Sequence, residues 1–293
     1  MKSTTHEIHA SLTRYLQRHR RRFDAVLFDV DGTLVRGGDA LPGVPELLAA
    51  LRVWRLPFVL LTNDGNHSTI EKARLLRRAG IPVAPSEIVS CADAIADYVA
   101  VHRLAGSRAF IMGDLGKPCY ARRARLRTTR RLAALPRCAG VIVGESHYEW
   151  EPTFNAVLNF FIGKPDAFLL VPNPDVYWPG RRRNIHIGAG GKARFLQLVL
   201  EEYGVRVKPE FLGKPNPAIF VRALHHLRRR WPSARVRAGA RVLVAGDSLA
   251  ADIVGARRMG FTAALVLTGI TPRGRIETPL DGPARPQLVF ERV

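Results

Sequence analysis

Short, wholly apolar runs alternate along this chain with longer segments whose apolar residues recur every three or four positions. Three of the runs are Val26–Phe28, Phe58–Leu61 and Val242–Ala245, and polar residues follow closely after each. A short run that is apolar at every position is typical of a strand buried on both faces, as in a parallel sheet. Because helical patterns separate the runs, the sequence predicts an α/β fold with a doubly wound, Rossmann-like parallel sheet.

The alternation continues from about Ile81, where a second series of strands and helices indicates a smaller α/β unit. Its predicted strands lie at 109–112, 140–143 and 167–171, and its predicted helices at 87–101, 122–135 and 152–161. A glycine-rich hinge at 188–191 and a helix over 195–203 are expected to lead back to the larger unit. A strand over 262–267 is expected to be its last, because the residues after 271 are rich in proline and glycine and predict a loop or tail.

The first apolar run carries candidate chemistry at its end, in Asp29-Val30-Asp31-Gly32-Thr33. In open α/β sheets, ligands bind beyond the carboxyl ends of the strands, where Asp29 and Asp31 would lie. Two carboxylates this close repel each other unless a cation or a shared proton intervenes. Gly32 allows a sharp turn that brings backbone N–H groups close to an anion. The stretch therefore fits a divalent metal beside a phosphate, although a strand ending in an acidic turn explains a lone Asp-x-Asp-Gly about equally well.

Other predicted strand ends carry polar residues of the same kind. Thr62 and Asn63 follow the second run, Lys214 lies in a turn before a predicted helix, and Asp247 and Asp252 follow the third run. Taken singly, these residues have simpler explanations, such as a helix-initiating threonine, a solvated lysine, a helix cap and a surface carboxylate. Their occurrence together and in this order predicts one shared site at the edge of the sheet.

In this set of residues the chain resembles the haloacid dehalogenase-like (HAD) superfamily, over roughly residues 23–269. The superfamily has four short motifs: Asp-x-Asp-Gly-Thr, a strand ending in Thr or Ser, a Lys before Pro, and Gly-Asp followed by a later Asp. The matching residues are Asp29–Thr33, Thr62, Lys214-Pro215, and Gly246-Asp247 with Asp252.

A long insertion between the second and third motifs is similar to the subclass IIA, NagD-like branch, which carries an α/β cap there. Thr62-Asn63, Asn173-Pro174-Asp175 and Gly188-Ala189-Gly190 also resemble that branch. The domains predicted on this basis are a basic helical extension over 1–22, the HAD core over 23–82, the cap over 83–186, the rest of the core over 187–275 and a tail over 276–293.

The resemblance implies a role for each residue that matches a motif. Asp29 would be the nucleophile that forms an aspartyl-phosphate, and Asp31 would be the general acid for the leaving group and then the general base for water. Mg²⁺ is the implied cofactor. The implied metal ligands and their supports are Asp29, Asp31 through its carbonyl, Asp247 and Asp252. The implied phosphate-binding residues are Gly32, Thr62, Asn63 and Lys214.

The cap of such an enzyme would close over the site and select the leaving group. Candidate substrate residues in and after it are Asn173, Asp175, Arg181, Arg182 and Arg183. A solvated turn explains these residues about equally well, because the segment around Pro172–Gly180 is dense in turn formers.

Composition changes the picture in one respect, the net charge of +20 over 293 residues. Such a charge is typical of proteins that bind nucleic acid or acidic membranes. The excess is nearly all arginine spread along the chain, without an aromatic-interleaved nucleic-acid motif, so a nucleic-acid partner is not expected. No apolar run is long enough to span a membrane, and three cysteines without a Cys-x-x-Cys pair fit reduced thiols in the cytoplasm.

These observations predict a Mg²⁺-dependent phosphatase that hydrolyses small phosphorylated metabolites. Sugar phosphates, nucleoside monophosphates, phosphoglycolate and aryl phosphates are the substrates that the resemblance implies. A homo-oligomer formed through the cap is a further candidate assembly. Two alternatives stay open: a non-catalytic nucleic-acid-associated or scaffold protein on a HAD fold, and a phosphotransferase that passes the phosphoryl group to another acceptor.

Overall fold

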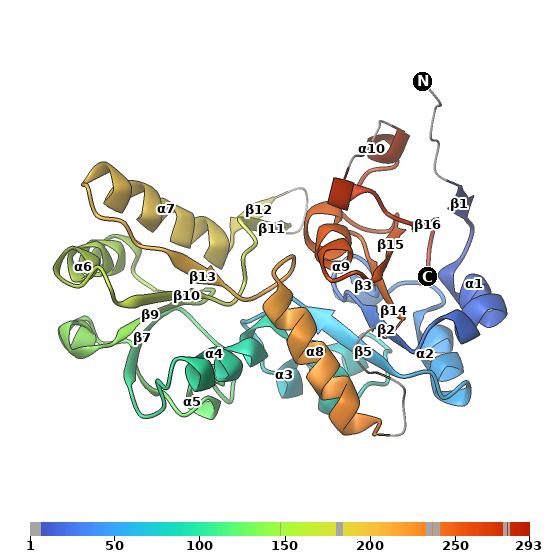
Figure 1. Ribbon diagram of the computed structural model, residues 1–293, viewed down its shortest axis with the longest axis horizontal. Helices are drawn as coiled ribbons and strands as arrows, with labels where there is room; N and C mark the ends of the chain where they lie inside the picture. Colours follow the sequence, from blue (N-terminus) through green and yellow to red (C-terminus); the bar gives the residue numbers. More distant parts are fainter. Residues whose placement is uncertain are drawn as a thin grey trace. The chain divides into compact units, whose positions relative to one another are not determined.

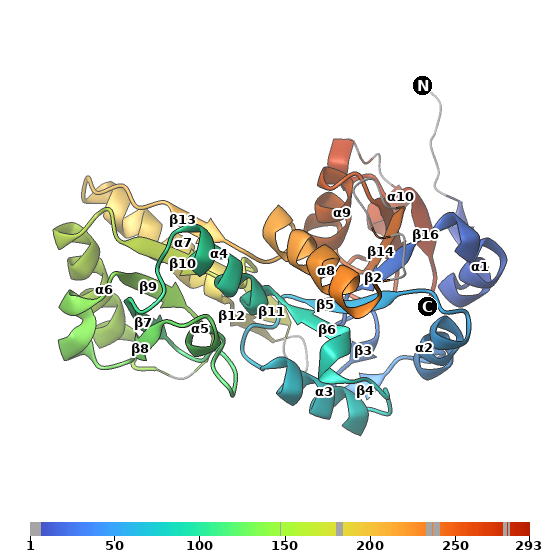
Figure 2. The ribbon, with the colours of Figure 1, turned by 60° about the horizontal axis from the view of Figure 1, so that its bottom comes forward.

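A computed structural model of the protein describes residues 7–146, 148–179, 184–232, 236, 241–277, 280 and 282–293. The chain divides into two compact units, whose elements are labelled in Figure 1 and seen again in Figure 2. The first unit comprises Met1–Thr62, Lys72–Val89 and Lys214–Val293, and the second comprises Asn63–Glu71 and Ser90–Gly213. The five predicted domain ranges differ from this division and stay a prediction.

The first unit is built on a seven-stranded sheet in the order β1-β16-β15-β14-β2-β5-β6. The described pairings from β1 through to β5 are all parallel, which confirms the predicted parallel α/β sheet. In the middle of the sheet, Phe28 of β2 pairs with Ala245 of β14, so the carboxyl ends of these two strands lie side by side. The strands are β1 (Ile8–His9), β2 (Ala25–Phe28), β5 (Phe58–Thr62), β6 (Ile88–Ser90), β14 (Val242–Gly246), β15 (Thr262–Val266) and β16 (Leu288–Phe290).

Helices around this sheet bury one apolar face each, and β2, β5 and β14 are buried along their whole length. Helix α2, for example, buries Leu47, Leu48 and Leu51 in the same cluster as Phe28 and Phe58. The α-helices and the π-helical turn are α1 (Leu12–His19), α2 (Val44–Val53), α3 (Thr69–Arg78), α8 (Pro217–Arg230), the π-helical turn (Leu249–Ile253), α9 (Val254–Arg258) and α10 (Gly274–Glu277). A small antiparallel hairpin joins β3 (Val35–Arg36) and β4 (Asp39–Ala40).

The second unit has its own five-stranded parallel sheet, in the order β13-β10-β9-β7-β8. Its core gathers Phe110, Val141, Phe161, Leu169 and Leu196. The strands are β7 (Arg108–Met112), β8 (Arg127–Thr129), β9 (Gly140–Val143), β10 (Phe168–Val171) and β13 (Pro209–Phe211). The helices are α4 (Ile95–Val101), α5 (Tyr120–Arg123), α6 (Trp150–Gly163) and α7 (Ala189–Glu202), and β11 (Tyr177–Pro179) and β12 (Ile185–Ile187) form an antiparallel hairpin.

Two of the helices predicted for the smaller α/β unit are wrong in part. In the segment 87–101, strand β6 precedes a 3₁₀ turn over Cys91–Ala94, and only α4 is α-helical. The Ser90 side chain caps the start of this turn by accepting from the Ala92 N–H, so helical structure begins only after β6. The segment 122–135 is interrupted after α5, because Arg125 has a φ of 66°, which a helix cannot continue. Strand β8 and a 3₁₀ turn over Leu132–Arg137 occupy the rest.

Two further elements lie where the sequence did not place them. Helix α7 was expected over 195–203 in the larger unit, but it begins at Ala189 and packs Ala193, Leu196 and Leu200 into the core of the second unit. An amphipathic pattern shows that a helix covers a sheet without showing which sheet. The predicted tail after 276 includes β16, which pairs with β15 and β1. A strand of three residues is too short for its periodicity to be recognised.

Within the ranges that the structure describes, no helix combines the length and apolar character needed to cross a membrane.

Candidate active site

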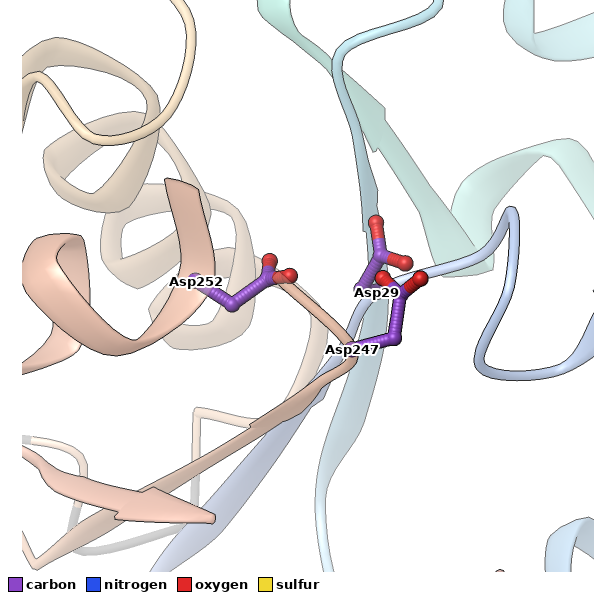
Figure 3. A group of neighbouring side chains, drawn as sticks. All are labelled: Asp29, Asp247 and Asp252. Carbon is purple, nitrogen blue, oxygen red and sulfur yellow. The ribbon is translucent and has the colours of Figure 1, made fainter. Parts of the chain in front are cut away.

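The parallel pairing of β2 with β14 brings together carboxylates that are far apart in the sequence. Asp29 follows β2, Asp247 follows β14, and Asp252 lies on the helical turn after it (Figure 3). All three are buried, and one carboxylate oxygen of each lies within 4.8 Å of the other two. The predicted cluster of acidic residues at the sheet edge is therefore present in the structure.

Lys214 is the cation at the centre of this cluster. Its Nζ lies 2.5 Å from Asp29 Oδ1 and 2.7 Å from Asp252 Oδ1, and it also donates to the Leu61 carbonyl at 3.2 Å. Lys214 is only 2% exposed, so these contacts replace the water that its ammonium group would otherwise bind. The lysine joins the end of β2 to the turn after β14 and fixes the orientation of the Asp29 carboxylate.

Hydrogen bonds from neighbouring groups hold a second oxygen of Asp29 and of Asp252 and one oxygen of Asp247. Thr33 Oγ1 donates to Asp29 Oδ2 at 3.1 Å, and the Ser248 N–H donates to Asp252 Oδ2 at 3.1 Å. The Ile270 N–H donates to Asp247 Oδ2 at 2.7 Å. The carboxylates are thus positioned by the fold itself, which pre-organises the site for a ligand.

Gly32 is required where the chain turns beside the cluster. It has a φ of 93°, in the left-handed region that favours glycine, and a Cβ atom there would overlap the Asp247 carboxylate. Thr268 Oγ1 donates to the Gly32 carbonyl at 2.7 Å and holds the turn in place. The predicted sharp turn at Gly32 is present, but the Gly32 N–H donates to the Val35 carbonyl at 2.8 Å and does not point at an anion as expected.

The charges of the buried groups do not balance. If all were ionised, the buried Asp29, Asp247 and Asp252 would carry three negative charges against the one positive charge of Lys214. Burial raises the pKa of Asp29 to about 7, with Lys214 opposing the shift, and burial and Asp29 together raise the pKa of Asp247 to about 7. Burial alone would lower the pKa of Lys214, but Asp252 and Asp29 raise it above its usual value. A divalent cation would supply the missing charge, and carboxylate oxygens are the ligands that such a cation prefers.

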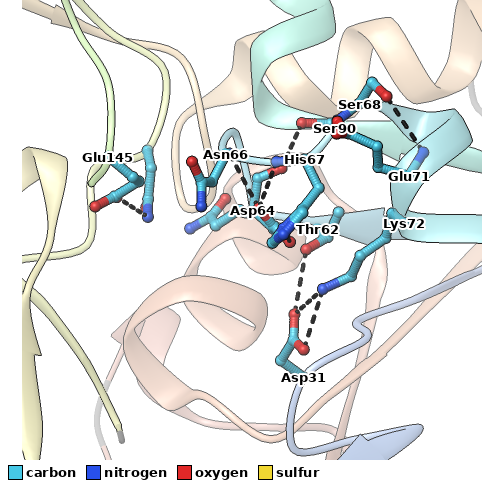
Figure 4. A network of polar contacts seen from close by, with 12 residues as sticks. Asp31, Thr62, Asp64, Asn66, His67, Ser68, Glu71, Lys72, Ser90 and Glu145 are labelled. Atoms are coloured by element: carbon cyan, nitrogen blue, oxygen red, sulfur yellow. Dashed lines mark hydrogen bonds and ion pairs between the residues drawn. The ribbon is translucent and has the colours of Figure 1, made fainter. Parts of the chain in front are cut away.

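Asp31 lies beside the cluster in a different environment. Its carboxylate accepts from Lys72 Nζ at 2.8 Å and from Thr62 Oγ1 at 3.5 Å, as Figure 4 shows. The Asp31 side chain is 61% exposed, whereas that of Lys72 is 9% exposed. Asp31 is therefore the carboxylate of the site that solvent and a ligand can reach.

Sequence reasoning missed Lys72, although a signal was available. Lys72 lies on α3 four residues before Leu76, which is buried, so the two share a helix face. A lysine at a position of the helical pattern that should be apolar predicts an acidic partner nearby, because burying an ammonium group without a partner is costly.

The other predicted residues have partners within the second unit. Asn63 Nδ2 donates to Asp175 Oδ1 at 3.1 Å, and Asn173 Nδ2 donates to Glu145 Oε1 at 3.0 Å. Asn173 Oδ1 also accepts from the Asp175 N–H at 2.9 Å, which closes the turn. Their predicted roles toward phosphate or substrate stay predictions. Arg181, Arg182 and Arg183 lie outside the described residues.

Comparison with known proteins supports the resemblance seen in the motifs. A family model described as haloacid dehalogenase-like hydrolase matches residues 26–124, and a HAD-hydrolase-like model matches residues 211–293. These two ranges contain Asp29, Asp31 and Thr62, and then Lys214, Asp247 and Asp252.

Individual relatives match nearly the whole chain. The ribonucleotide monophosphatase NagD of Escherichia coli K12 is 28% identical over 92% of this chain and 96% of its own length, and its solved structure matches with a TM-score of 0.74. The acid sugar phosphatase of Staphylococcus aureus USA300 is 26% identical over 86% of this chain and 89% of its own length. A glycerol phosphate phosphatase from Mycobacterium tuberculosis, solved in complex with magnesium, shares the fold at 24% identity, with a TM-score of 0.78 over 93% of this chain and 76% of that one. The predicted membership is confirmed, and the chain belongs to the haloacid dehalogenase-like hydrolases.

Proposed function

We propose that this protein is a Mg²⁺-dependent phosphatase that hydrolyses small phosphate monoesters through an aspartyl-phosphate. The observation that carries the proposal is the arrangement around Asp29, a buried carboxylate 2.5 Å from the Lys214 ammonium and next to Asp247 and Asp252. Hydrolysis of phosphate monoesters is very slow without a catalyst, so catalysis must supply on the order of 20 kcal/mol. A carboxylate nucleophile beside a fixed cation divides that barrier between two displacements.

In the first displacement, a carboxylate oxygen of Asp29 forms a bond to phosphorus as the bond between phosphorus and the ester oxygen breaks. The proton of the Asp31 carboxyl passes to the ester oxygen, and the alcohol leaves. In the second displacement, water gives a proton back to Asp31 and its oxygen bonds to phosphorus, which releases inorganic phosphate and the Asp29 carboxylate. Asp31 suits both transfers because it is exposed while Asp29 is buried.

The residues present fit a magnesium ion. Asp29 and Asp247 would hold it with the carbonyl of Asp31, and Asp252 would support the site through Lys214 and the Ser248 N–H. The bound ion would offset the negative charge of the nucleophile and of the substrate phosphoryl group. Thr62, the Asn63 backbone and Lys214 are the proposed donors to the phosphoryl oxygens. Gly32 is not among them, because its N–H donates to the Val35 carbonyl at 2.8 Å.

The substrate class is proposed from the relatives as well as from the site. One relative is named a ribonucleotide monophosphatase and another an acid sugar phosphatase, so the shared chemistry is hydrolysis of a phosphate monoester on a small polar alcohol. Nucleoside monophosphates, sugar phosphates, phosphoglycolate and aryl phosphates are therefore the substrates to screen. Asn173 and Asp175 remain candidate residues for selecting among them.

The test is a phosphate-release screen over these compounds with Mg²⁺, on the wild type and on Asp29→Asn. This change keeps the shape of the side chain and removes the attacking charge, so turnover should fall by about three orders of magnitude or more. Circular dichroism of both proteins controls for folding. Near-normal turnover by Asp29→Asn would remove Asp29 from its role, and no Mg²⁺-dependent release by the wild type would favour a non-catalytic protein.

A further inference from the structure

We propose that Lys72 is a positioning residue that holds the Asp31 carboxyl in the orientation from which it protonates the leaving group. This inference rests on the proposed phosphatase function and adds a residue that the four motifs do not contain. Lys72 comes from α3, whereas Asp31 follows β2, so the contact joins two separate elements of the first unit (Figure 4).

Lys72 contacts Asp31 at two points, and we call this pair of contacts the clamp. Lys72 Nζ lies 3.2 Å from Asp31 Oδ1 and 2.8 Å from Asp31 Oδ2, so the ammonium group contacts both oxygens. Thr62 Oγ1 approaches Oδ2 from β5 at 3.5 Å. Contacts to both oxygens restrict rotation of the carboxyl about its bond to Cβ, which a single hydrogen bond would leave much freer.

Lys72 is buried and Asp31 is exposed, as expected if the lysine holds a carboxyl that acts on a substrate. The Lys72 side chain is 9% exposed, on the same helix face as Ala73 and Leu76, which lie in the apolar core. The Asp31 side chain is 61% exposed, and an isolated carboxylate on the surface would sample several rotamers. A buried lysine therefore holds a carboxyl that would otherwise sample several rotamers.

This arrangement matters most for substrates with poor leaving groups. Departure of an alkoxide requires a proton from Asp31 at the moment the bond to phosphorus breaks, and proton transfer depends steeply on position. A p-nitrophenolate ion is stable without a proton, so its departure depends far less on Asp31. Loss of the clamp should therefore penalise alkyl esters selectively.

The test compares benzyl phosphate with p-nitrophenyl phosphate on the wild type and on Lys72→Met. Before cleavage, both esters carry an aromatic ring and no charge besides that of the phosphate, so direct binding of a second anion by Lys72 does not contribute. We expect kcat/KM for benzyl phosphate to fall about tenfold or more beyond any fall for p-nitrophenyl phosphate. Both kcat/KM values are measured on one preparation of each protein, so their ratio does not depend on the fraction of protein that is folded.

Two variants serve as controls. Lys192→Met removes another buried lysine, 3.8 Å from Glu145 in the second unit, and should leave the substrate ratio at the wild-type value. Lys72→Arg keeps a cation able to contact both oxygens, so its ratio of kcat/KM for the two esters should lie close to the wild-type ratio. If Lys72→Met does not yield folded protein, Lys72→Gln replaces it, because its shorter polar side chain also lacks the charge.

A double-mutant cycle separates an action through Asp31 from a direct contact with substrate. In an Asp31→Asn background, Lys72→Met should have no further effect on kcat/KM for p-nitrophenyl phosphate. A further loss there, or an unchanged substrate ratio in Lys72→Met alone, would overturn the proposal. Absence of Mg²⁺-dependent turnover of both esters by the wild type would instead reject the proposed function on which it rests.

Discussion

At the scale of residues, the buried acidic cluster contains three carboxyl groups and one ammonium group. Lys214 is shared between Asp29 and Asp252, while Asp247 is held by the Ile270 N–H, a neutral donor. Burial raises the pKa of Asp247 to about 7, which is the response of a carboxylate in a poorly compensated site. The charge of Asp247 should therefore contribute directly to binding a divalent cation.

Replacing Asp247 with Asn should raise the Mg²⁺ concentration needed for half-maximal activity by about tenfold or more, because one charged ligand is lost while the shape is kept. The measurement is phosphate release against Mg²⁺ concentration after treatment with EDTA. Asp39→Asn, which changes an exposed carboxylate on β4 of the same unit, is the matched control and should not shift the curve. Wild-type activity that survives EDTA unchanged would refute the metal assignment.

At the scale of elements, the sequence predicts buried strands well and short elements poorly. The runs that became β2, β5 and β14 are buried at every position. Asp29, Asp247 and Asp252 meet as expected, whereas Asn63 bonds Asp175 in the second unit. Strand β16 contributes only three residues after a proline-rich stretch, and its partners are distant in the sequence. The Lys72–Asp31 contact was missed for a related reason, since a helical pattern gives the face of a helix but not what lies opposite.

The structure therefore makes the C-terminal residues part of the core. Phe290 is fully buried, and its ring lies 5.4 Å from that of Tyr15. Phe290→Ala should lower the free energy of unfolding by about 3–5 kcal/mol, through lost burial and the cavity left behind. Denaturant unfolding measures this change, with Val53→Ala, at a position 81% exposed, as the control. A Phe290→Ala protein as stable as the control would mean that the segment is a tail after all.

At the scale of the whole molecule, the two units have separate sheets and separate cores. The proposed metal ligands Asp29 and Asp247, together with Lys214 and Asp252, all belong to the first unit. The charge of +20 arises from arginines spread over the chain and does not compensate the buried carboxylates locally. Binding of Mg²⁺ should consequently stabilise the first unit and leave the stability of the second unit unchanged.

Hydrogen exchange in the presence and absence of Mg²⁺ tests this difference. An ion that binds only the folded site stabilises it by about 2.7 kcal/mol at a concentration 100 times its Kd. We expect exchange of the backbone amides of β2 and β14 to slow accordingly, whereas that of β9 and β10 should stay the same, because no proposed ligand lies in their unit. Asp247→Asn should abolish the slowing at the same Mg²⁺ concentration. Equal slowing in both sheets would show that the metal acts on the whole molecule, and slowing confined to β9 and β10 would place the ion in the second unit.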